Sequence, residues 1–103
     1  MLNMIMKFRP EYIPLILQGR KNSTVRNERK GDFGDSFVVE GHTYVISSVL
    51  RVPLAEALEY YPGEGFGSRQ EMYDTIRAIY PNMTLDTYVY LHRFETLEAF
   101  ESD

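Results

Sequence analysis

The stretch GRKNSTVR, Gly19–Arg26, brings a lysine, two arginines and two hydroxyl groups together in one short segment. If Ser23–Arg26 is extended, Thr24 and Arg26 project to one face, and Lys21 in the preceding turn can reach the same side. An amine, a hydroxyl and a guanidinium in one place could hold an anion or a carbonyl oxygen. Threonine can also act as a nucleophile when a base takes its proton, and a lysine with a pKa lowered by burial is such a base.

The basic charge of the chain is concentrated around this stretch. The protein has a net charge of -4, yet residues 20–30 hold five basic side chains and one acid, which leaves a local charge of +4. A focused patch suits one small anionic ligand better than bulk coating of nucleic acid. One alternative is an ordinary solvated loop. Another is that the segment only stabilises the domain, with Arg26 paired to an internal acid such as Asp35.

A second candidate segment is YPGEGFGSRQE, residues 61–71. Its three closely spaced glycines predict a loop that is flexible or sharply bent, and Glu64 is the only ionisable group between them. Glu64 could turn into a cleft, and Phe66 could anchor the loop or stack on a ring. The alternative is that Glu64 is a solvent-facing turn residue.

The two histidines of the chain are weaker candidates for a functional site. His42 and His92 have no second histidine at metal-ligand spacing, so we expect ordinary surface or partly buried histidines. We expect no metal and no cofactor. No phosphate-binding glycine loop, dinucleotide fingerprint or nucleophile elbow is present in the sequence.

Length and composition place these segments in one soluble domain. A chain of 103 residues with 44% hydrophobic residues supports one modest core, expected over about residues 4–95 with an acidic tail at 96–103. There are no cysteines, and MLNMIMKF lacks the pattern of an export signal. We therefore expect a cytoplasmic protein without a membrane span, as a monomer or weak dimer.

The elements that must position the candidate residues follow from pattern. Residues 4–8 favour a strand. Residues 11–19 favour a helix, with Pro14 in its first turn and Gly19 as its C-terminal cap. Strands on either side of a two-residue turn at Glu40–Gly41 are expected to form a hairpin. Their apolar residues fall at both odd and even positions, which is typical of a strand that is covered on both faces.

The second half of the chain predicts two helices and a closing strand. Residues 53–61 favour a helical turn, and Ser68 with Glu71 forms a capping box that starts a helix ending near Pro81. Residues 86–95 alternate as a strand, and the tail beyond is expected to fray. The order β-α-β-β-β-α-α-β is an α+β domain, with a small barrel and a helix packed on it.

The pattern Gly19-x-Lys21-x-x-Thr24-x-Arg26, followed by KGDFGDSFVV, EGFGSRQEM and IYP, resembles the ASCH domain family, a branch of the PUA-like β-barrels. The resemblance covers roughly Phe8 to Phe94. It implies a small β-barrel with two to three helices packed at its side. It also implies a cleft between barrel and helices that binds RNA or a nucleotide.

The chain is further similar to small members of that family that remove the acetyl group from N4-acetylcytidine. This resemblance implies that Lys21 is the proton acceptor, Thr24 the nucleophile and Glu64 the proton donor. Ligand contacts are then expected from Arg20, Arg26 and Phe66. The partner is a nucleoside, or single-stranded or modified RNA, and the alternative function is a non-catalytic RNA-binding module.

Overall fold

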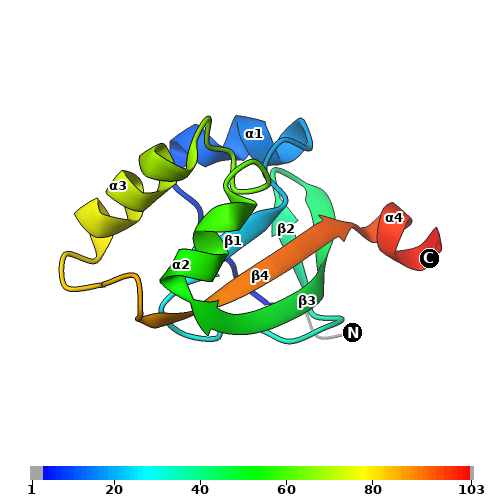
Figure 1. Ribbon diagram of the computed structural model, residues 1–103. Coiled ribbons are helices and arrows are strands. Elements are labelled where there is room, and N and C mark those ends of the chain that lie inside the picture. Colours follow the sequence, from blue (N-terminus) through cyan, green and yellow to red (C-terminus); the bar gives the residue numbers. More distant parts are fainter. Residues whose placement is uncertain (1–3, 103) are drawn as a thin grey trace.

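Four antiparallel strands form one curled sheet, a half-barrel in which spatial order differs from sequence order (Figure 1). The computed structural model describes residues 4–102, and Met1–Asn3 and Asp103 lie outside that range. The strands lie in the order β1-β4-β3-β2. Their bounds are β1 Ser23–Arg26, β2 Ser36–Val39, β3 His42–Pro53 and β4 Tyr88–Thr96.

The hairpin between β2 and β3 turns at the predicted residues. Val39 pairs with His42, so the loop is the two residues between them. Glu40 has φ 49° and Gly41 has φ 81°, as a type I′ turn requires. This turn matches the right-handed twist of the strands that it joins.

The long strand β3 is covered on both sides over part of its length, as its apolar pattern predicts. Tyr44, Val45 and Ile46 are buried in succession. The pairing with β4 then shifts register between Ile46 and Ser48, which marks a bulge. A bulge increases local twist, so it helps the sheet to curl.

Short helices connect and cover the strands (Figure 1). Pro14 lies in the first turn of α1, and Gly19 follows its end with φ 76°, both as predicted. Among residues 4–102, no helix is long and apolar enough to cross a membrane. The α-helices are α1 Ile13–Leu17, α2 Leu54–Ala57, α3 Arg69–Ile79 and α4 Leu97–Ser102, and the 3-10 helices are η1 Pro10–Tyr12 and η2 Leu58–Tyr60.

The core divides between the two faces of the sheet. Val89 on β4 packs with apolar residues of α2, η2 and α3, including the buried Met72. Phe94 packs instead with Phe37 and with Ile16 of α1. Since alternate residues of a strand face opposite sides, β4 supplies both clusters.

Two expectations about the ends of the chain are wrong. Residues 4–8 do not form a strand: Met4 donates one backbone hydrogen bond to Ser36, and the buried side chain of Met6 packs into the core. The predicted order of elements also ends with a strand, whereas α4 follows β4 directly. Its start is stabilised where the Thr96 hydroxyl accepts a hydrogen bond from the amide of Ala99 at 3.1 Å.

Candidate functional site

The glycine loop lies along the free edge of β1. The amides of Asn22 and Ser23 both donate to the carbonyl of Gly63, at 2.7 and 3.2 Å. A side chain at Gly63 would bring a Cβ within 2.6 Å of the Asn22 side-chain oxygen, and Gly65 has φ +92° with Leu15 close by. The loop is therefore sharply bent and closely packed against the strand, and glycine permits both features.

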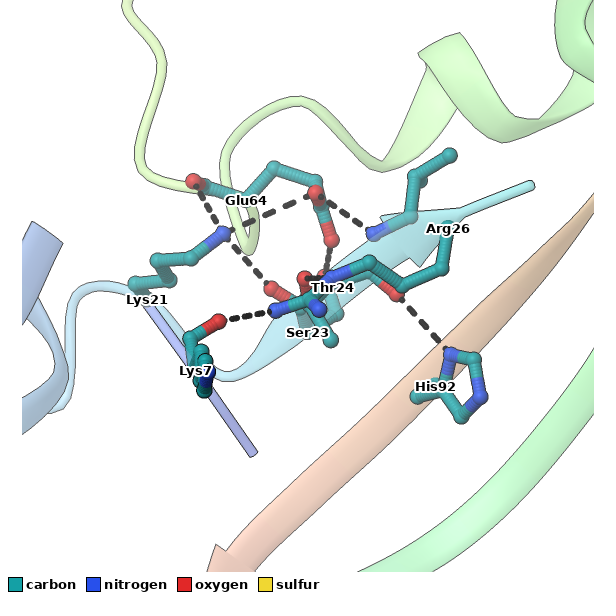
Figure 2. A network of polar contacts seen from close by, with 8 residues as sticks. Lys7, Lys21, Ser23, Thr24, Arg26, Glu64 and His92 are labelled. Atoms are coloured by element: carbon teal, nitrogen blue, oxygen red, sulfur yellow. Dashed lines mark hydrogen bonds and ion pairs between the residues drawn. The ribbon is translucent and has the colours of Figure 1, made fainter. Parts of the chain in front are cut away.

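Glu64 is held inside this contact rather than facing solvent. It is 3% exposed, so the interpretation of a solvent-facing turn residue is wrong. One carboxylate oxygen accepts from the amide of Val25 at 3.2 Å, and the other accepts from the Ser23 hydroxyl (Figure 2). The carboxylate thus caps a backbone group that the sheet leaves unpaired.

Lys21 lies against the same carboxylate. It is 4% exposed, and its Nζ donates to the carbonyls of Ser23 at 2.8 Å and Glu64 at 3.1 Å. Nζ also lies 3.6 Å from Glu64 Oε1 and 4.9 Å from the centre of the Tyr12 ring. Burial lowers the pKa of Lys21, the nearby carboxylate opposes this, and Arg26 adds to the lowering.

Thr24 and Arg26 share one face of β1, as the alternation predicts. Arg26 Nε donates to Thr24 Oγ1 at 2.9 Å, and its Nη2 donates to the carbonyl of Lys7 at 2.6 Å (Figure 2). The guanidinium also lies 5.4 Å from the centre of the Phe8 ring. In the described part of the chain it has no ion pair with Asp35, so that pairing is wrong.

These side chains line one cavity of about 210 Å³. Its walls come from the segment before α1, from β1, from the glycine loop and from α3. Five of the six predicted site residues are in the lining, and they are Lys21, Thr24, Arg26, Glu64 and Phe66. Arg20 is exposed and is not part of it.

The predicted basic patch is largely neutralised in the structure. Arg29 forms an ion pair with Asp32, and Lys30 lies 3.5 Å from the carboxylate of Glu28. The positive charge therefore does not spread over a broad surface. At the site, Lys21 is paired with Glu64, and the Arg26 guanidinium lines the cavity with no ion pair among the described residues.

Sequence reasoning missed three residues of the site. Ser23 holds the Glu64 carboxylate, Tyr12 packs edge-on against Phe66 with ring centres 6.1 Å apart, and His92 lies behind Thr24. His92 is fully buried, so the expectation of a surface or partly buried histidine is wrong. The alternation in residues 86–95 could have found it, because it places the histidine on the same face as Phe94.

Metal chemistry has no support from the side chains that the structure describes. Across residues 4–102, no three His, Cys, Asp or Glu side chains gather where they could hold a metal ion. The candidate site contains one carboxylate, and that carboxylate is already bonded to Ser23 and Val25.

Comparisons with known proteins establish the fold. The sequence matches no family model, and no curated protein is detectably similar to it. Among solved structures, it is similar to the ASCH domain from Lactobacillus crispatus, with 17% identity and a TM-score of 0.74 over 92% of this chain and 79% of that one.

Two further solved structures are similar over nearly the whole of both chains. A protein described only as hypothetical is 22% identical, with a TM-score of 0.73 over 93% of this chain and 100% of that one. A protein from Pyrococcus furiosus is 23% identical, with a TM-score of 0.66 over 94% and 99%. The chain therefore has an ASCH-like α+β fold, as the sequence resemblance predicts.

Proposed function

We propose that the cavity at the free edge of β1 binds a small nucleoside, and that the protein hydrolyses the amide of N4-acetylcytidine-type nucleosides. The observation that carries the proposal is the convergence of an amine, a hydroxyl, a guanidinium and a carboxylate on one cavity. They belong to Lys21, Thr24, Arg26 and Glu64. This is the set of groups that an acyl transfer to a threonine needs.

The size and lining of the cavity favour a small planar ligand. Its volume of about 210 Å³ is below the roughly 300–1,000 Å³ of sites for larger ligands. Aromatic side chains around it offer faces and edges for a nucleobase. They are Phe8, Tyr12, Phe66 and Tyr80. The net charge of -4 also suits a nucleoside better than a long RNA.

In the proposed reaction, Thr24 Oγ1 attacks the acyl carbon while Lys21 takes the hydroxyl proton. The carbon–nitrogen bond then breaks, and the cytosine amine leaves with a proton from Glu64. Water hydrolyses the threonine ester to release acetate. Within residues 4–102 the Thr24 hydroxyl has one hydrogen bond, accepted from Arg26, so its own hydrogen is available to a base.

The arrangement of the Lys21 amine supports a role as proton acceptor. Its two hydrogen bonds go to carbonyl oxygens, and a neutral amine has two N–H groups to donate. Burial lowers the pKa of Lys21, and Arg26 adds to this lowering, which favours the neutral amine that a base needs. Arg26 then stabilises the oxyanion that forms on attack.

The test is incubation of the purified protein with N4-acetylcytidine, with acetate and cytidine measured over time. Thr24→Ala should abolish turnover, whereas Thr24→Ser, which keeps a hydroxyl, should retain part of it. Thr84→Ala is the matched control, because Thr84 is an exposed threonine that does not line the cavity. Equal turnover in wild type and in folded Thr24→Ala would refute the reaction.

A non-catalytic RNA-binding module is the second candidate, and the exposed Arg20 beside the buried Lys21 favours it. In that case no acetate is released, and single-stranded RNA binds with an affinity that falls as salt rises. Arg20→Gln should then weaken binding, whereas Arg69→Gln, which removes an exposed arginine on α3, should not. Acetate release without RNA binding would reject this alternative.

A further inference from the structure

His92 is a buried titratable group that the proposed reaction does not use. It lies in the middle of β4, directly opposite Thr24 of β1 on one side and Val49 of β3 on the other. Both ring nitrogens have backbone partners. Nε2 accepts from the amide of Lys30 at 2.9 Å, and Nδ1 lies 3.3 Å from the carbonyl oxygen of Thr24 (Figure 2).

These two partners fix the protonation state of the ring. The Lys30 amide can only donate, so Nε2 has no hydrogen, and the Thr24 carbonyl can only accept, so Nδ1 has one. The ring is therefore neutral, in the Nδ1–H form. A protonated ring would place an N–H group against the N–H of Lys30 and lose that hydrogen bond.

The loop that follows β1 is exposed at residues 27–30 but contacts β3 just beyond Lys30. Gly34 donates to the carbonyl of Ile46 at 2.9 Å. A Cβ at Gly31 would lie 2.6 Å from the sulfur of Met4 and 2.9 Å from the side chain of Ile46. Through His92, this loop is joined to the backbone of Thr24.

We propose that neutral His92 is a positioning residue that ties the backbone of Thr24 to the loop at Lys30, and that protonation of the ring releases this link. The hydrogen bonds themselves do not depend on the proposed function. The effect on turnover does rest on it. Because β1 has only four residues, loss of this link would shift the Thr24 hydroxyl relative to Lys21 and Glu64.

The surroundings of the ring favour its neutral form. The charges that act on it come from Arg26 on β1 and from Arg29 in the loop, and β3 contributes the apolar Val49 opposite. Burial is the largest cause and lowers the pKa of His92; backbone hydrogen bonds to Thr24 and Tyr90 oppose this, and the two arginines add to the lowering. Protonation therefore occurs only below the ordinary value of 6.5 for a histidine.

The first test is NMR on the ligand-free protein. The nitrogen shifts of the imidazole should report the Nδ1–H form at neutral pH. As pH falls, the ring, the Lys30 amide and the Thr24 carbonyl should titrate with one midpoint below 6.5. An Nε2–H ring would overturn the positioning role. A ring that stays neutral until the protein unfolds, or backbone signals that do not follow it, would overturn the release.

The second test compares turnover of N4-acetylcytidine across pH in His92→Gln, His92→Leu and the control His42→Gln. Gln offers one donor and one acceptor but does not titrate, so it should remove the additional fall in kcat that protonation of His92 causes, while the dependence on Lys21 remains. Leu offers neither and should lower kcat at every pH by about tenfold or more. His42→Gln should keep the wild-type profile.

The outcomes separate this inference from the proposed function. No turnover by the wild type at any pH refutes the hydrolase, while the NMR test still decides the role of His92. A His92→Gln profile identical to that of the wild type, or unchanged kcat in a folded His92→Leu protein, refutes the positioning role even if the hydrolase is correct.

Discussion

Lys21 and Glu64 are 43 residues apart in the sequence, yet Nζ lies 3.6 Å from Oε1 at the free edge of β1. There the amine donates to the carbonyl of Ser23, and the carboxylate accepts from the amide of Val25. These are backbone groups that a neighbouring strand would otherwise satisfy. The pair therefore completes the edge of the sheet as well as supplying the proposed acid and base.

The first prediction concerns the stability of this pair. Lys21→Met or Glu64→Gln alone should lower the free energy of unfolding by about 3–5 kcal/mol, because each leaves a buried polar partner uncompensated. The double variant should cost clearly less than the sum of the two. Urea denaturation of the four proteins in the cycle measures this coupling.

The ion pair between Arg69 and Glu59 is the matched control. Its atoms are 3.2 Å apart, but the side chains of Arg69 and Glu59 are 42% and 67% exposed. Arg69→Ala should therefore change stability by no more than about 1 kcal/mol. Strict additivity of Lys21→Met and Glu64→Gln would show that the two side chains act independently, against our interpretation of the edge.

The second prediction concerns the pH dependence of the proposed hydrolysis. The base must be neutral to accept the Thr24 proton, so kcat/KM should rise with pH as Lys21 loses its proton. Burial lowers the pKa of Lys21 from 10.5, so this rise should be complete at a lower pH than for an exposed lysine. Initial rates across pH measure it.

A lysine-to-arginine change is the control for that profile. In Lys21→Arg the guanidinium keeps its charge, so the rise with pH should disappear together with most of the turnover. If the same rise persisted in Lys21→Arg, another group would be titrating. The assignment of Lys21 as proton acceptor would then be incorrect.

The third prediction concerns stability at acidic pH. The pKa of His92 is lowered in the folded protein, so between that pKa and 6.5 the unfolded chain binds more protons than the folded one. The stabilisation that comes from neutral His92 should be fully present above pH 6.5. It should decrease as pH falls, by at most about 1.4 kcal/mol per pH unit. Urea denaturation at several pH values measures the slope.

Comparison of the two histidines isolates the contribution of His92. His92→Gln should show a smaller loss of stability with acid than the wild type, because glutamine does not titrate. His42 is exposed, and His42→Gln should follow the wild-type slope. Equal slopes in all three proteins would mean that His92 is protonated as easily in the folded state as in the unfolded one.

The features predicted correctly from sequence are those that neighbouring residues determine. Ser68 starts α3 by accepting from the amide of Glu71 at 3.1 Å, and Gly41 provides the positive φ of the hairpin. Even here the structure adds a detail. The Glu71 carboxylate accepts from Gly67 at 3.3 Å, one residue before the position that a capping box predicts.

The features that sequence could not provide depend on contacts between distant segments. The alternation of Thr24 and Arg26 is local and was predictable, but the burial of Glu64 depends on how the glycine loop packs against β1. Residues 4–8 have the composition of a strand, yet Met6 contributes to the core outside the sheet. Composition alone does not distinguish a strand from another extended apolar segment.

The last prediction concerns the loop that carries Glu64. Gly65→Ala and Gly34→Ala should both cost about 1–2 kcal/mol of stability, because their φ angles of +92° and +89° disfavour a side chain. At Gly34 an added Cβ meets nothing within 4 Å, but at Gly65 it lies 3.0 Å from Leu15 and 3.5 Å from Lys21. Only Gly65→Ala should therefore disturb the Lys21–Glu64 contact and lower the turnover of N4-acetylcytidine. Urea denaturation and initial rates of both variants measure the two effects separately, and an equal loss of turnover in both would show that the loop does not position the acid.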